Sequence, residues 1–304
     1  MDALPDFYKN MQISWYEPKG DLHIVCHDRH FYVSTDVMLR VSSGIGEMLT
    51  PELIAVYEKD TNGKIVIALP DVNPEAFDVF CNLVYSGMDL VKAGPQPFLL
   101  HPLLEFIDQY KCRDRVSLTA QTWLRCDLES RPHSDLWMML VFAYRMNMGA
   151  LFRVIGKRLI STTSARPLFR DWASIIGNCE AMPESFYKEI QKSQDRLLAK
   201  AGEKILYILR PTYDHLDDAE ATQQIGRYTE SLLEAGLMPG SPNYQKMTFT
   251  DMRTAASSLP HDMWVTTQLD MKLQRCLDRE EGPCFLCLKG EYCDLHIDKR
   301  ATED

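Results

Sequence analysis

The sequence predicts an α+β fold that is mostly helical, with a small sheet near its start. Residues 21–27 alternate between two faces, as a half-buried strand does, and the apolar face carries Leu22, Ile24 and Cys26. Residues 64–69 form a short β-branched apolar run, which also favours a strand. Beyond residue 102 the apolar residues recur mainly at helical spacing. We therefore expect a strand-and-helix unit followed by an all-helical extension.

The elements of the strand-containing part follow from local signals. We expect the first twenty residues to be irregular, because Pro5, Pro18 and Gly20 interrupt them. The strand over 21–27 then continues into a hairpin, with a turn at Asp28-Arg29 and a return strand over 30–33. From Thr35 the apolar spacing becomes helical, which predicts one helix over 37–49.

Further helices are predicted from their starts and their apolar stripes. Asn73 can cap a helix whose first residue is Pro74, and Gly87 is expected to end it. Ser134 can cap a later helix in the same way. The remaining helices are expected over 103–110, 116–124, the segment with Phe152, Ile155 and Leu159 on one face, 183–209 and 217–237, with one or two more around 250–277.

These elements divide the chain into five parts. Residues 238–243 are the clearest linker, because they combine two prolines with a glycine. The expected parts are an irregular N-terminal segment (1–20), a strand-and-helix domain (21–127), a helical extension (134–237), C-terminal helices (248–278) and a tail rich in cysteine and histidine (279–304).

The composition is that of a folded, acidic protein. Of the 304 residues 45% are hydrophobic and 25% are charged, so the chain has enough apolar surface to offset the entropy of folding. The formal net charge of −10 argues against nonspecific nucleic-acid binding, which needs a basic surface. We therefore expect protein partners and no direct nucleic-acid partner.

The sequence shows no targeting or membrane signal. Its N-terminal residues lack the apolar stretch of a secretory signal, and the longest apolar run, 136–144, is too short to cross a membrane. Without a secretory context the nine cysteines are expected to be reduced thiols. We expect an intracellular protein, nuclear or cytoplasmic, with no membrane partner.

An ordered set of motifs runs through the first 127 residues. The matching positions are Phe31, Val33, Val37, Met38, Ser42, Leu69, Pro70, Asp71, Phe77 and the run from Val84 to Gly87. In spacing this set resembles the BTB/POZ domain family, whose pattern is a strand pair, F-x-[AV]-H-x-x-[VL]-L-x-x-x-S, a strand ending in L-P-[DE] and a helix ending in [IV]-Y-[TS]-G. One departure is Ser34, which stands where the family usually has His.

The resemblance extends beyond these motifs. Asp108 to Cys112 and the helix with Trp123 look like the family's closing helix pair, and residues 135–160 look like the helical extension of its fungal branch. The resemblance implies a non-enzymatic protein–protein interaction scaffold that self-associates as a homodimer and recruits partner proteins. A small sheet with exposed edges favours such pairing on physical grounds as well.

A short motif before the strand over 64–69 concerns one class of partner. Many BTB proteins present a hydrophobic-x-Glu tripeptide here to a cullin scaffold, and Val56-Tyr57-Glu58 matches it. Val56 would fill an apolar groove while the carboxylate of Glu58 fixes its orientation. The alternative is a solvent-facing helix end with a buried Tyr57. The second candidate function is therefore a substrate adaptor of a cullin-type ubiquitin ligase.

The tail carries two close pairs of potential metal ligands. Cys284, Cys287, Cys293 and His296 follow the pattern C-x2-C-x5-C-x2-H, and three thiols with one imidazole form a common structural zinc set. One structural zinc ion is therefore the only cofactor expected. Cys276 is a further candidate ligand, but we interpret it as a residue that faces the core of its helix. The alternative is four reduced side chains in a tail whose Phe285, Leu286 and Leu288 pack on the body.

No catalytic residue is expected, because phosphate-loop, zinc-protease and hydrolase motifs are all missing from the sequence. A zinc-dependent enzyme that uses the tail is the alternative from a different functional class. His23, His27 and His30 are interpreted as surface or interface residues, and five other cysteines as small core residues: Cys26, Cys81, Cys112, Cys126 and Cys179.

Overall fold

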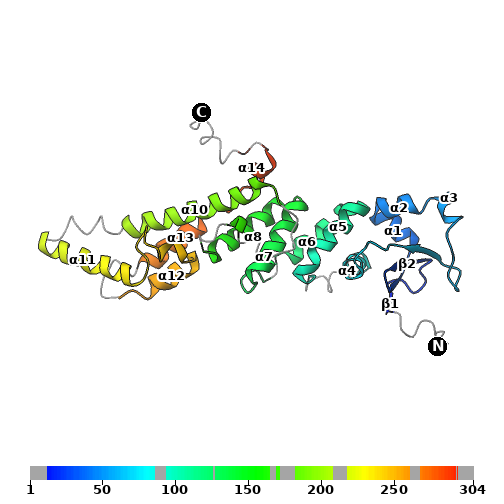
Figure 1. Cartoon of the computed structure of the whole chain (residues 1–304), viewed down its shortest axis with the longest axis horizontal. Helices are drawn as coiled ribbons and strands as arrows, with labels where there is room; N and C mark the ends of the chain where they lie inside the picture. The colour runs from blue at the N-terminus through cyan, green and yellow to red at the C-terminus, as the bar shows by residue number, and fades with distance from the viewer. Residues whose placement is uncertain are drawn as a thin grey trace. The chain divides into compact units, whose positions relative to one another are not determined.

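The computed structural model describes residues 12–85, 94–125, 127–164, 169–171, 182–207, 218–260, 268–291 and 293 (Figure 1). The chain divides into two compact units. The first unit comprises residues 1–128 and 141–148, and the second comprises residues 129–140 and 149–304. The α+β class is confirmed, since the described part is mostly helical with one small mixed sheet.

The first unit contains the sheet, whose strand order is β1-β3-β2-β4. Strands β2 and β3 form an antiparallel hairpin, whereas β1 runs parallel to β3 and β4 runs parallel to β2. The described elements of this unit are β1 (Gln12–Trp15), β2 (Leu22–Cys26), β3 (Arg29–Val33), α1 (Thr35–Val41), α2 (Ser43–Met48), α3 (Pro51–Ile54), β4 (Ile65–Ala68), α4 (Pro74–Tyr85), η3 (Pro97–Leu99), α5 (Leu100–Tyr110) and α6 (Arg113–Trp123).

Aromatic side chains build the core of this unit. The alternation in β2 is confirmed, because Leu22, Ile24 and Cys26 are fully buried. On β3, Phe31 meets Phe77 of α4 edge to face, with ring centroids 4.9 Å apart. Phe77 also meets Phe106 of α5 edge to face at 5.5 Å, so one ring joins the sheet to two helices. Cys81 and Cys112 are buried as expected, whereas Cys126 and Cys179 lie outside the described residues.

Two expectations for the strands are wrong. The supposedly irregular N-terminal segment contains β1, whose four residues are too few to show a clear alternation and which is held by pairing with β3. The hairpin turn lies at His27-Asp28, because Cys26 pairs with Arg29. A two-residue turn of this kind needs positive φ, and His27 adopts φ 53°.

The single helix expected over 37–49 is broken at Ser42. This residue is extended, with φ −142° and ψ 110°, and its side chain accepts a hydrogen bond from the amide of Ile45, which starts α2. Its hydroxyl also donates to the carbonyl of Tyr110 at 2.6 Å. A methyl group at Gly44 would lie 2.6 Å from Tyr110 Cα, so the end of α5 packs directly on the start of α2.

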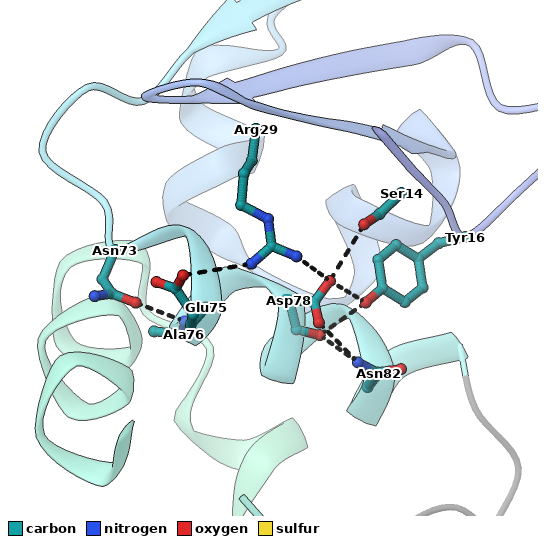
Figure 2. A network of polar contacts seen from close by, with 8 residues as sticks. All are labelled: Ser14, Tyr16, Arg29, Asn73, Glu75, Ala76, Asp78 and Asn82. Atoms are coloured by element: carbon teal, nitrogen blue, oxygen red, sulfur yellow. Dashed lines mark hydrogen bonds and ion pairs between the residues drawn. The ribbon is translucent and has the colours of Figure 1, made fainter. Parts of the chain in front are cut away.

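The start of α4 is confirmed, and its half-buried Asp78 links the helix to the sheet. Asn73 Oδ1 accepts from the amide of Ala76 at 2.9 Å, as a helix cap does. Figure 2 shows Asp78 of α4 at the centre of a polar network. Tyr16 donates to its carboxylate at 2.7 Å, and Arg29 of β3 lies 3.4 Å from the same oxygen. The predicted end at Gly87 lies outside the described residues.

The second unit is built from helices. Its described elements are η5 (Tyr244–Lys246), α8 (Gly149–Thr162), α10 (Glu184–Tyr207), α11 (Asp218–Glu234), α12 (Phe249–Ser257), α13 (Leu269–Asp278) and α14 (Phe285–Lys289). Helix α7 (His133–Arg145) contributes residues to both units. It begins before Ser134, because the carbonyl of Pro132 already accepts from the amides of Asp135 and Leu136.

The core of the second unit follows the predicted apolar stripe of α8. Phe152, Ile155 and Leu159 are fully buried. Phe152 meets Phe186 of α10 edge to face at 5.7 Å, and Trp137 meets the same ring at 5.7 Å. Among the described helices, none has both the length and the apolar composition that a membrane span requires.

Candidate metal centre

Three thiols converge near the end of the chain. The sulfur atoms of Cys284, Cys287 and Cys293 all lie within 4.8 Å of one another, and Cys284 Sγ is 3.4 Å from Cys293 Sγ. Zinc–thiolate bonds of about 2.3 Å in a tetrahedron keep sulfur atoms about 3.8 Å apart. The three thiols therefore stand at a spacing that one metal ion can bridge.

A single helical turn with a glycine end brings the thiols together. Cys284 immediately precedes α14, and Cys287 lies within it. Gly290 ends the helix with φ 71°, and its amide donates to the carbonyl of Cys287. The amide of Glu291 donates to the carbonyl of Leu286 at 2.9 Å, which completes a Schellman motif. This reversal returns the chain, so that Cys293 reaches Cys284.

The segment before the thiols is fixed on α8 by close contacts at glycines. A methyl group at Gly156 would lie 2.4 Å from Pro283 Cγ, and one at Gly149 would lie 3.1 Å from the ring of Phe285. Phe285 is buried and meets Phe152 edge to face at 5.6 Å. Phe285 therefore packs on the body, as one alternative predicted, and the thiols converge as well.

Two of the three thiols are buried and the third is half-buried. Cys284 and Cys293 are each 6% exposed, and Cys287 is half-buried. Burial and the neighbouring Cys284 and Cys293 raise the pKa of the Cys287 thiol to about 12. A bound cation reverses this preference, because it stabilises thiolates. The amide of Cys284 donates to the Glu189 carboxylate of α10 at 3.2 Å, which fixes the first ligand.

The structure brings together three of the four predicted ligands. The fourth, His296, lies outside the described residues. Cys276 is buried on α13 with its sulfur 4.0 Å from the carbonyl of Lys200, so it faces the helix core as expected.

The predicted partner-binding residues Val56 and Glu58 both reach solvent. Val56 is 74% exposed, and Glu58 is also exposed. Their backbone is fixed, since the amides of Val56 and Tyr57 donate to the carbonyl of Leu53 and the carbonyl of Glu58 accepts from Val66. Tyr57 is only half-buried, which differs from the alternative of a buried Tyr57.

A contact between the buried His23 and the half-buried His30 is the feature that sequence reasoning missed. His23 Nε2 lies 2.8 Å from His30 Nδ1, and His23 Nδ1 lies 3.4 Å from the carboxylate of Asp60. His23 is 5% exposed and stacks on Tyr32, so its interpretation as a surface or interface residue is wrong. The correct hairpin turn would have placed His23 diagonally opposite His30, whereas Asp60 comes from a loop that no spacing rule identifies.

This pair predicts acid sensitivity of the first unit. Burial lowers the pKa of both histidines, and the neighbouring His30 lowers that of His23 further, although Asp60 opposes the effect. In the folded chain the pKa of each histidine lies below the unfolded value of about 6.5. The contribution of the pair to the free energy of unfolding is therefore complete above about pH 6.5 and declines as the pH falls below it.

We expect the free energy of unfolding, measured with urea at pH 7 and pH 5, to be smaller at pH 5. His30→Gln is expected to weaken this dependence, since the variant has one titrating ring instead of two. Equal stabilities of the unmodified chain at the two pH values would contradict the argument.

Comparison of the chain with models of known families, with curated proteins and with solved structures gives no match.

Proposed function

We propose that the chain is a non-enzymatic protein–protein interaction scaffold whose first unit is a BTB/POZ-like domain. One observation carries the proposal, namely the order of elements. The motif pattern requires a strand pair, a helix, a strand, a helix and a closing helix pair. The described elements β2, β3, α1, β4, α4, α5 and α6 follow that order, with α2 and α3 between α1 and β4.

Contacts between motif positions add support. The amide of Ser34, which replaces the usual family His, donates to the Tyr85 hydroxyl at 2.8 Å. Ser42 bonds to the end of α5, which belongs to the expected closing pair. Residues of widely separated motifs thus contact one another, which is consistent with one folded domain.

Self-association is the first test of this proposal. In the first unit Leu39 of α1 and Leu53 of α3 are exposed apolar side chains in addition to Val56. We expect the full chain to form a dimer in sedimentation-equilibrium experiments, because covering such side chains is favourable. A monomer at all concentrations up to about 100 μM, where even weak dimers with micromolar Kd are populated, would contradict self-association.

The exposed Val56 favours a second candidate function, that of a cullin-type ubiquitin-ligase adaptor. We expect the full chain to bind the N-terminal domain of a cullin scaffold. Val56→Asp and Glu58→Arg should each weaken the affinity at least about tenfold, because an anchor side chain or its orienting charge is lost. Calorimetric titration measures the effect.

Glu52→Arg is a matched control for this experiment. Glu52 is an exposed acid of α3, so the substitution makes the same charge change outside the tripeptide. It should leave the affinity nearly unchanged. An equal loss in the control, or no binding by the unmodified chain, would exclude the adaptor function.

We also propose that the three thiols and His296 hold one structural zinc ion. The nearly buried Cys284 and Cys293 and the fixed turn around Gly290 support a structural role. Such an ion would order a segment that has few apolar residues of its own.

A further inference from the structure

We infer that Cys287 is an oxidation site, where a peroxide forms a disulfide with Cys284 or Cys293 and releases the metal. The inference rests on the proposed zinc site, because a bound cation is what keeps these thiols deprotonated. The class of co-substrate is a small hydroperoxide, represented by hydrogen peroxide.

Access distinguishes Cys287 from its neighbours. It is half-buried, whereas Cys284 and Cys293 are each 6% exposed. A small oxidant therefore reaches the Cys287 sulfur first. Cys276, the other described cysteine of the second unit, offers no such combination, since it is buried on α13 away from the three thiols.

Proximity supplies the second step. Both potential partner sulfurs lie within 4.8 Å of Cys287 Sγ, whereas a disulfide needs about 2.05 Å. Forming the bond therefore needs a local movement of the two side chains. Because two candidate thiols are available, a sulfenic acid at Cys287 is captured before further oxidation.

One hydroperoxide molecule is consumed for each disulfide that forms. The Cys287 thiolate attacks one peroxide oxygen, the O–O bond breaks, and a sulfenic acid and hydroxide form. A second thiolate then attacks the sulfenic sulfur, the S–O bond breaks, and a second hydroxide leaves. The two sulfurs lose two electrons, which reduce the peroxide, and the hydroxides take up protons to become water.

Disulfide formation removes two of the three thiolate ligands. A tetrahedral zinc site cannot persist with one thiolate, so the ion leaves. Oxidation is therefore coupled to metal release.

The test uses the purified full chain loaded with zinc. Hydrogen peroxide is added at a molar equivalent, released zinc is followed with a chromogenic chelator, and disulfides are mapped by peptide mass spectrometry. We expect about one zinc ion released for each disulfide formed, with Cys287 in that disulfide. Cys276→Ser is the matched control and should release zinc at an unchanged rate.

A second measurement keeps the two proposals separable. The zinc content is measured before peroxide is added, and the zinc-loaded chain and its Cys287→Ser variant are then treated with peroxide and a sulfenic-acid trap. A trapped adduct at Cys287 that is lost in the variant supports the oxidation site, whereas a chain that binds no zinc overturns both proposals. Zinc that stays bound while Cys287 remains unmodified overturns the inference and leaves the zinc site intact. A first adduct at any other cysteine also overturns it.

Discussion

Replacing Phe77 with Ala is expected to lower the free energy of unfolding of the first unit by about 3–5 kcal/mol. The Phe77 ring is fully buried and contacts Phe31 of the sheet, Phe80 of its own helix and Phe106 of α5. Removing the ring leaves a cavity. Phe31, Phe80 and Phe106 lie on three different elements, so they cannot all move inward to fill it. Urea unfolding followed by circular dichroism measures the loss.

Phe98→Ala is the matched control for this prediction. Phe98 is 63% exposed in η3, so the same substitution removes little buried surface. We expect a change within about 0.5 kcal/mol. A similar loss in both variants, or a loss below about 1 kcal/mol for Phe77→Ala, would show that Phe77 does not hold the sheet and helices together.

Replacing Cys284 with Ser should reduce the zinc content of the purified chain from about one ion to nearly none. The variant loses one of the three clustered ligands and the one whose backbone is fixed by Glu189. Binding at a free zinc concentration about 100 times the Kd stabilises the folded chain by about 2.7 kcal/mol. For a unit of this size, loss of zinc lowers the Tm by roughly 5–10 °C.

Elemental analysis and thermal unfolding with and without a chelator test this result. Cys276→Ser should retain the zinc, because its sulfur faces Lys200 on α10. A chelator should lower the Tm of that control as it does for the unmodified chain. The metal centre is excluded if the unmodified chain contains no zinc after purification in its presence, or if Cys284→Ser binds as much.

Local signals predicted the elements whose causes are local. The alternation of Leu22, Ile24 and Cys26 identified β2, and the Asn73 cap identified the start of α4. The burial of Phe152 followed from helical spacing alone. In each case neighbouring residues in the sequence determine the structure, so the pattern is sufficient.

The features that were missed depend on distant residues. Ser42 breaks the helix expected over 37–49 while its hydroxyl bonds to Tyr110, a contact that spacing cannot reveal. Strand β1 exists through its pairing with β3. His23 is buried because Asp60 and Tyr32 lie against it. Tertiary contacts decide all three cases, and a single sequence contains no direct record of them.

The candidate metal centre was predictable because its ligand spacing is short. Three thiols that lie within ten residues need only a tight reversal, and Gly290 provides it. The support from α8 was not predictable, since the close approach of Pro283 to Gly156 joins residues far apart in the sequence.

The first unit has a consequence for biosynthesis, because its residues are not continuous. Residues 141–148 belong to it although residues 129–140 belong to the second unit. The carboxylate of Asp108 accepts hydrogen bonds from Arg113 and from Arg145, each at 2.7 Å. Arg145 is translated after the whole of segment 1–128. A nascent chain that ends at Leu128 therefore lacks part of the first unit. A chain truncated there contains Asp108 but lacks Arg145, one of the two arginines that bind its carboxylate.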